Sequence, residues 1–272
     1  MKSRVLISAL AAAVVVGACS PPSGAPSSPS SETPRPATPS DTEVAEPGST
    51  SESTRASMPF DGPTDVEIPM ADGLVLRGTF VPGQDPDGSA VLLLHMYGSD
   101  RSSWDPFALA LAPSGISSLA IDLRGHGATG GNEDWALAQQ DTAAAIAWLS
   151  SVDGLDPKRI GIAGASIGAN LALVQAADDP GSVAAAAALS PGLDYFRVEI
   201  DGRAEDIGEL PLFLAASEQD GYSAESVRTL AAQAQGAPTV AIFEGSAHGT
   251  DMFAASPELA EMLFKFLSGA LR

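Results

Sequence analysis

The sequence predicts an α/β domain, an open and mostly parallel twisted sheet with helices on both faces. Two observations along residues 59–272 support this fold class. Short, nearly continuous apolar runs recur, as expected of strands that a parallel sheet buries on both faces. Helix-like segments separate several of these runs, and such alternation favours an open sheet whose sites lie at the carboxyl ends of the strands.

The elements can be placed in order along the chain. An antiparallel hairpin is expected first, with residues 66–71 and 74–82 on either side of the turn Asp72-Gly73. Further strands are predicted at residues 90–96, 116–123, 159–165, 183–190, 211–217 and 239–245. Helices are predicted at residues 135–149, 167–177, 224–235 and 257–271. The stretch 191–210 is too short for a large lid, so we expect a shallow, open cleft.

The N-terminal residues have the composition of an export signal. Lys2 and Arg4 precede an apolar run over residues 5–16, which is too short to cross a bilayer comfortably. The residues Val16-Gly17-Ala18-Cys19 resemble a bacterial lipobox, in which the cysteine is lipidated and becomes the first mature residue. We therefore expect a lipoprotein signal peptide at residues 1–18 and an acyl anchor on Cys19. An ordinary cleavage site with an incidental cysteine is the alternative.

Residues 19–58 are rich in Pro, Ser and Thr and nearly free of large apolar side chains. Such a segment cannot bury enough surface to offset the entropy of ordering it, so a disordered tether is predicted. The tether would hold the domain of residues 59–272 off a bacterial membrane, lipid-anchored on its extracytoplasmic side.

Charge and cysteine content narrow the function classes. The 34 acidic and 14 basic residues give a formal charge of -20, which disfavours contact with nucleic-acid phosphates. Solubility of an exported protein explains this charge, and a salt-adapted source explains it equally well. The single cysteine excludes an intrachain disulfide and a cysteine-based zinc site. No metal or organic cofactor is expected.

The segment Gly164-Ala165-Ser166-Ile167-Gly168 follows a predicted strand and opens a predicted helix. In this context the pattern GxSxG is a nucleophile elbow, a tight turn that exposes the serine hydroxyl at a helix N-terminus. A purely structural turn is the alternative. Ser166 is therefore the candidate nucleophile, and the amides of Ile167 and Tyr97 are the candidate oxyanion hole.

A serine nucleophile needs a base and an orienting acid. Enzymes with this elbow follow the chain order nucleophile, acid, histidine, which favours His248 over His95 and His126. Asp220 is the preferred acid because it lies deeper in its loop than Glu218, and Asp194 is a further alternative. Any of these side chains could instead be an ordinary surface residue.

With these residues in hand, the chain from Val66 onward resembles the α/β-hydrolase superfamily, and within it the dienelactone hydrolase-like serine esterases. The resemblance rests on the segments His95-Met96-Tyr97-Gly98, Asp122-Leu123-Arg124-Gly125-His126-Gly127, Gly164-Ala165-Ser166-Ile167-Gly168, Ser217-Glu218-Gln219-Asp220 and Ala247-His248-Gly249. It implies Asp220 as the acid and a structural role for the loop around His126. Relatives usually have His-Gly at His95-Met96, and dienelactone hydrolases proper carry a nucleophilic cysteine where this chain has Ser166.

These observations predict a serine hydrolase that cleaves small-molecule carboxylic esters through an acyl-enzyme. Two alternatives remain open. One is an inactive, lipid-anchored binding module with this fold, and the other is an exported serine peptidase or acyltransferase with the same triad.

Overall fold

The structure, a computed structural model, describes residues 59–84 and 86–272. The predicted signal peptide (1–18), the tether (19–58) and Cys19 lie outside the described residues. Within the described ranges, no helix is both long and apolar enough to cross a membrane.

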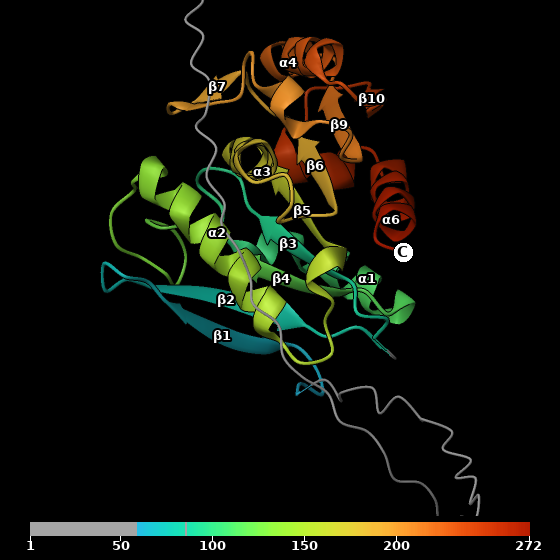
Figure 1. The fold of residues 1–272 in the computed structure, drawn as a ribbon. Coiled ribbons are helices and arrows are strands. Elements are labelled where there is room, and N and C mark those ends of the chain that lie inside the picture. Colours follow the sequence, from blue (N-terminus) through green and yellow to red (C-terminus); the bar gives the residue numbers. More distant parts are fainter. Residues whose placement is uncertain (1–58, 85) are drawn as a thin grey trace, which may run out of the picture. The chain divides into compact units, whose positions relative to one another are not determined.

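A central sheet of eight strands organises the domain. From one edge to the other the order is β1-β2-β4-β3-β5-β6-β9-β10, which Figure 1 shows running from bottom to top. The pairs β1–β2 and β2–β4 are antiparallel and the other pairs are parallel. The strands are β1 (Thr64–Pro69), β2 (Val75–Val81), β3 (Ala90–Leu94), β4 (Ser117–Ile121), β5 (Ile160–Ala165), β6 (Ala185–Leu189), β9 (Leu212–Ser217) and β10 (Thr239–Phe243).

Two hydrophobic layers cover this sheet. One face packs against α2 (Trp135–Ser151), α3 (Ile167–Asp178) and α4 (Gly221–Gln233). The other face packs against α1 (Asp105–Leu111), α5 (Met252–Ala255) and α6 (Glu258–Ala270). Every residue of β3, β4, β5, β6 and β9 is buried, because helices cover these strands on both sides. The predicted fold class is confirmed.

The structure contains helices or strands that the sequence did not predict at three places, namely α1, α5 and the stretch 191–210. Helix α1 is only seven residues long and begins with Asp105-Pro106, a pair that resembles a loop as much as a helix start. A small hairpin of β7 (Asp194–Tyr195) and β8 (Val198–Glu199) stands within residues 191–210, where no strand was predicted. No large lid is present in that stretch, as expected.

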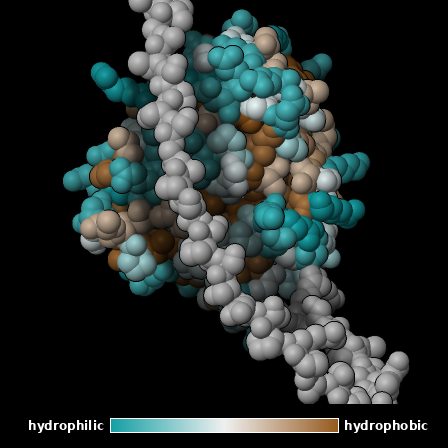
Figure 2. All heavy atoms as spheres, in the orientation of Figure 1, coloured by the Kyte–Doolittle hydropathy of each residue, from teal (hydrophilic) through white to brown (hydrophobic). Residues whose placement is uncertain are grey.

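Most charged side chains of the described residues lie at the surface. Figure 2 shows mostly hydrophilic residues on the face toward the viewer, with smaller hydrophobic areas between them. A formal charge of -20 needs such a surface, because charged side chains are costly to bury.

Candidate active site

Ser166 lies on a strained elbow between β5 and α3. Its backbone has φ 53° and ψ -118°, and the residue is the N-cap of α3. A Cβ on Gly164 would come 2.0 Å from the carbonyl oxygen of Gly168, and a Cβ on Gly168 would come 2.4 Å from that of Leu94. Both glycines are therefore required, because only hydrogen fits where strand and helix approach so closely. The positive φ at a serine costs roughly 1–3 kcal/mol, a strain typical of functional positions.

His248 and Asp220 come together across two loops. The His248 Nδ1 atom is 2.6 Å from Asp220 Oδ2, and both side chains are partly exposed. Asp220 directly precedes α4, and His248 lies between β10 and a short 3₁₀ turn. The Ser217 hydroxyl donates to the Ala247 carbonyl oxygen at 2.7 Å and so joins the two loops. This geometry lets the carboxylate hold the imidazole with a proton on Nδ1 and leaves Nε2 for a reacting group.

Ser190 accepts a hydrogen bond from the loop that carries His248, a contact that the sequence analysis did not identify. The Gly249 amide donates to Ser190 Oγ at 2.9 Å. Ser190 follows β6, is fully buried, and has φ 51°. A positive φ at a buried serine is a tertiary feature, so no local sequence signal marks it.

The Ser166 hydroxyl and the His248 ring are not hydrogen-bonded to each other in the part of the chain that the structure describes. Nucleophile–base hydrogen bonds are often long without substrate and shorten when the substrate binds. The arrangement is therefore compatible with proton transfer in the complex.

The alternative acids have other partners. The Glu218 carboxylate lies 2.6 Å from Arg228 Nη2 on the surface. The Asp194 carboxylate accepts the Arg197 amide at 2.8 Å within the β7–β8 turn. Of the three candidates, Asp220 is the one hydrogen-bonded to His248.

His95 ties two strand ends together. Its Nδ1 atom is 2.8 Å from the Met96 carbonyl oxygen, and its Nε2 atom accepts the Leu123 amide at 2.9 Å. With Nε2 accepting, the proton sits on Nδ1 and the ring is neutral. Burial lowers the pKa of His95, and the hydrogen bond to the Met96 carbonyl oxygen and the nearby Asp122 and Asp100 carboxylates only partly oppose this effect.

This pKa shift predicts a pH effect on stability. The unfolded chain titrates near pH 6.5 at His95 and the folded chain titrates lower, so the unfolded state binds more protons as the pH falls. The contribution of His95 to the free energy of unfolding is therefore fully present above pH 6.5, and it is lost as the pH falls below that value. We expect His95→Gln, whose amide can replace both hydrogen bonds, to reduce the slope of unfolding free energy against pH by up to about 1.4 kcal/mol per pH unit. Urea denaturation between pH 5 and 7.5 measures this, and parallel curves for both proteins would contradict it.

His126 lies in a structural loop beside the site. Its Nδ1 atom is 3.2 Å from the Arg124 carbonyl oxygen. Arg124 makes two hydrogen bonds of 2.6 Å to the buried carboxylate of Asp141. Buried Asp122 accepts the amides of Arg101 and Ala128. These contacts hold the loop in place.

The two candidate oxyanion donors lie at neighbouring strand ends. Ile167 is the first residue of α3, and Tyr97 follows β3. Among the described residues, neither backbone amide has a hydrogen-bond acceptor. Met96 precedes Tyr97. A Cβ on Gly249 would lie 2.8 Å from the Met96 sulfur. The absent side chain at Gly249 thus makes room for methionine at the position where the resembling esterases usually have glycine.

The sequence profile of the alpha/beta hydrolase family matches residues 91–268. This match spans more than half of the chain and includes the elbow, the acid loop and the histidine loop. The chain belongs to the alpha/beta hydrolase family.

The chain is also similar to known proteins over part of its length. An uncharacterized protein of Mycobacterium tuberculosis strain H37Rv is 36% identical over 117 residues, which cover 43% of this chain and 42% of the relative. A polyketide transferase of a Penicillium species is 29% identical over 174 residues, which cover 58% of each chain. The chain therefore matches about half the length of these relatives.

Solved structures show the same fold. An esterase of Pyrococcus furiosus has a TM-score of 0.64 at 22% identity, covering 77% of this chain and 93% of its own. A dienelactone hydrolase of Anabaena variabilis has a TM-score of 0.62 at 22% identity, covering 77% and 99%. At this identity the likeness concerns the fold of the alpha/beta hydrolase domain.

Tyr195 is a further residue at this alpha/beta hydrolase site that the sequence analysis missed. Its hydroxyl lies 3.1 Å from Ser223 Oγ, and its ring centroid lies 6.3 Å from that of His248. Burial raises the pKa of the Tyr195 phenol, while the hydrogen bond with the Ser223 hydroxyl acts in the opposite direction. The β7–β8 hairpin therefore brings the Tyr195 ring beside His248.

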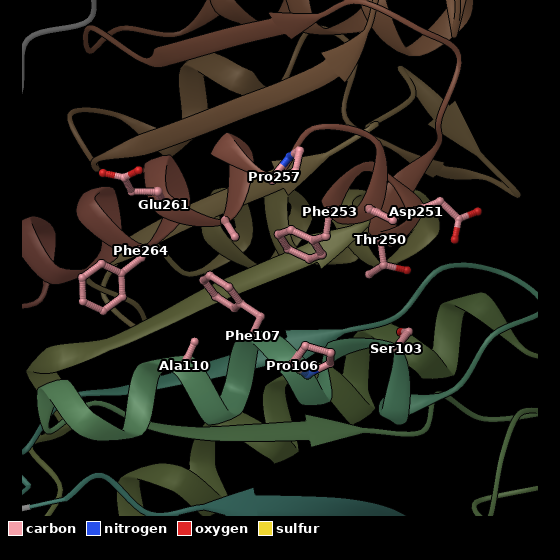
Figure 3. Close-up of a pocket in the computed structure, with 12 residues that line it drawn as sticks. Ser103, Pro106, Phe107, Ala110, Thr250, Asp251, Phe253, Pro257, Glu261 and Phe264 are labelled. Carbon is pink, nitrogen blue, oxygen red and sulfur yellow. The ribbon is translucent and has the colours of Figure 1, made fainter.

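A cavity of about 720 Å³ adjoins the residues that directly follow His248 in this alpha/beta hydrolase. Figure 3 shows Phe107 on α1 and Phe253 on α5 pointing toward each other in its lining, and their rings stack with centroids 5.5 Å apart. Thr250 and Asp251, which follow His248 closely, line the cavity, whereas Ser166 does not. It is thus separate from the nucleophile.

Proposed function

We propose that this alpha/beta hydrolase cleaves carboxylic esters, with Ser166 as nucleophile, His248 as base and Asp220 as orienting acid. The observation that carries the proposal is the hydrogen-bonded pair His248–Asp220 on loops beside a serine held at φ 53° on its elbow. Membership in a family that includes esterases supports it.

The proposed reaction has two steps. His248 Nε2 takes the hydroxyl proton as Ser166 Oγ attacks the ester carbonyl carbon, and the oxyanion accepts the amides of Ile167 and Tyr97. The alcohol then leaves with the proton from His248. Water then adds to the acyl-enzyme with His248 again as base. The bond between the acyl carbon and Ser166 Oγ breaks, His248 returns the proton to Ser166, and the carboxylic acid is released. Asp220 stabilises the imidazolium in both steps.

A covalent probe tests this proposal directly. An alkyl fluorophosphonate reacts with an activated serine and releases fluoride, so we expect one adduct per chain, located on Ser166 by peptide mass spectrometry. The labelled protein should lose its hydrolysis of short-chain 4-nitrophenyl esters in proportion to labelling. Ester turnover that continues in fully labelled protein would contradict the proposal. Absence of both labelling and turnover would favour the inactive binding module.

Acyl transfer or thioester cleavage is a second candidate, favoured by the similarity to a polyketide transferase. The same triad can release an acyl group from oxygen or sulfur and pass it to an acceptor other than water. Thioester substrates and added alcohols, with product analysis, distinguish these activities from ester hydrolysis. A serine peptidase would be identified by an amide panel.

Export and lipid anchoring form a separate part of the proposal. They rest on the sequence of residues 1–58 alone, with Cys19 as the lipidated residue. A site on the extracytoplasmic face of a membrane would meet small-molecule esters from outside the cell.

A further inference from the structure

The β7–β8 hairpin has an unusual tip. Its two turn residues, Phe196 and Arg197, have φ values of 53° and 70°. A two-residue turn of this kind requires positive φ at both positions and normally uses Asn-Gly or similar pairs. A bulky aromatic residue there is costly, and such strain persists where the surroundings enforce it.

The surroundings of the hairpin supply that enforcement. Asn170, on the helix that Ser166 begins, donates to the Val198 carbonyl oxygen at 2.7 Å and accepts the Gly192 amide at 3.0 Å. On the other side, the Tyr222 hydroxyl lies within 3.1 Å of both the amide and the carbonyl oxygen of Asp194. The hairpin is therefore fixed relative to the nucleophile.

The strained tip places Phe196 in a group of aromatic side chains. Its ring centroid lies 5.2 Å from that of Tyr97 and 5.2 Å from that of Trp135, and it stacks on Trp135 with an interplanar angle of 19°. The Tyr97 ring also meets His126 edge-on at 5.5 Å. We call Tyr97, His126, Trp135 and Phe196 the aromatic cluster.

Three of the four members of the aromatic cluster are open to solvent, and His126 is buried. Tyr97 and Phe196 are each 51% exposed, and Trp135 is partly exposed. Exposed apolar rings that are held in place beside polar groups are typical of binding sites rather than of a core. Packing of α2 on the sheet would explain the position of Trp135. It does not explain why a strained hairpin holds Phe196 outside the core.

The aromatic cluster is also next to the reacting atoms. Tyr97 carries the proposed oxyanion amide on its own backbone. Tyr195, directly before Phe196, has its ring centroid 6.3 Å from that of His248. Consecutive Cα atoms are only about 3.8 Å apart, so one short hairpin carries both a residue beside the proposed base and a residue of the aromatic cluster.

We infer that the aromatic cluster binds an aromatic ring of the substrate and that Phe196 is a specificity-determining residue. This inference rests on the proposed function and gives it a substrate class, namely esters with a planar ring near the carbonyl. Stacked and edge-on aromatic pairs contribute beyond simple area burial, which gives a planar ring an advantage over a saturated ring of similar size.

Matched substrates test the inference. Ethyl phenylacetate and ethyl cyclohexylacetate carry the ring on the acyl side, and benzyl acetate and cyclohexylmethyl acetate carry it on the alcohol side. Dividing each kcat/KM by the alkaline hydrolysis rate removes intrinsic reactivity. We expect the wild type to prefer the aromatic member of one pair by roughly tenfold, and that pair identifies which half of the ester the aromatic cluster holds.

Two variants at the hairpin tip complete the test. Phe196→Leu keeps an apolar side chain and should reduce the preference to about twofold or less. Arg197→Gly is the matched control because it removes the neighbouring positive-φ strain without altering a ring, and it should retain the preference. A wild type without preference, or a Phe196→Leu protein with the wild-type preference, would overturn the inference even if ester hydrolysis is observed.

A binding measurement separates this inference from the proposed function. Calorimetric titration of Ser166→Ala with ethyl phenylacetate and ethyl cyclohexylacetate, and with the two acetates, needs no turnover. Tighter binding of an aromatic ester that Phe196→Leu abolishes would support the aromatic cluster even if no ester is hydrolysed. Equal binding of both members of each pair would contradict it.

Discussion

Ser166→Ala is expected to lower kcat for 4-nitrophenyl butyrate by about 10⁴-fold or more. The hydroxyl is the atom that forms the acyl-enzyme, and no other side chain replaces it on the elbow. Removing one hydroxyl at an 8%-exposed position should leave the fold intact, so the melting temperature should stay within a few degrees. Steady-state kinetics and circular dichroism on the same samples measure both quantities.

Asp220 and Glu218, the two carboxylates of the loop after β9, provide a matched pair of variants for that experiment. Asp220→Asn should lower kcat on the order of 10⁴-fold because the amide disturbs the histidine tautomer. Glu218→Gln, two residues earlier, should stay within about twofold of the wild type because Glu218 pairs with Arg228 on the surface. A loss of activity in Glu218→Gln with an active Asp220→Asn would reverse the assignment of the acid. Full activity in Ser166→Ala would refute the triad.

Gly168→Ala is expected to destabilise the protein by about 3–5 kcal/mol or to prevent its folding. A Cβ there would lie 2.4 Å from the Leu94 carbonyl oxygen and 2.6 Å from that of His95. Both obstacles are backbone atoms at the end of a fully buried strand, so neither can move without disturbing the sheet. The free energy of unfolding from urea titration measures the loss.

Gly161→Ala is the matched control, because this glycine lies on β5 five residues before the nucleophile. A Cβ at Gly161 would meet only side-chain carbons of Leu267 and Leu271, at 3.4 Å or more. Such contacts are ordinary, so the change should cost less than about 1 kcal/mol. If Gly168→Ala were as stable as Gly161→Ala, the close approach of α3 to β3 would not be needed for the elbow.

The sequence predicted much of this fold because its main signals are local. Continuous apolar runs correctly placed the central strands, and the glycine spacing around Ser166 marked the turn between β5 and α3. Period and composition within a few residues are sufficient for such elements. The catalytic roles of Ser166, Asp220 and His248 stay predictions until the experiments above are made.

The β7–β8 hairpin shows what local patterns cannot provide. Phe196 and Arg197 have no preference for positive φ, so nothing in their identity announces a turn. Contacts with Asn170, 28 residues from Val198, and with Tyr222, 28 residues from Asp194, hold the hairpin in place. Such distant partners determine the conformation against the local preference of the chain.

By itself, the sequence determined the α/β class, the elbow around Ser166, and the chain order that favours His248. The tertiary structure decided which of two nearby carboxylates meets His248 and which aromatic rings gather around Phe196. Glu218 and Asp220 are two residues apart, yet the first pairs with Arg228 and the second with His248. The physical reason is that strands and turns follow from the local pattern of side chains, whereas a site is assembled by packing between segments that the chain itself keeps far apart.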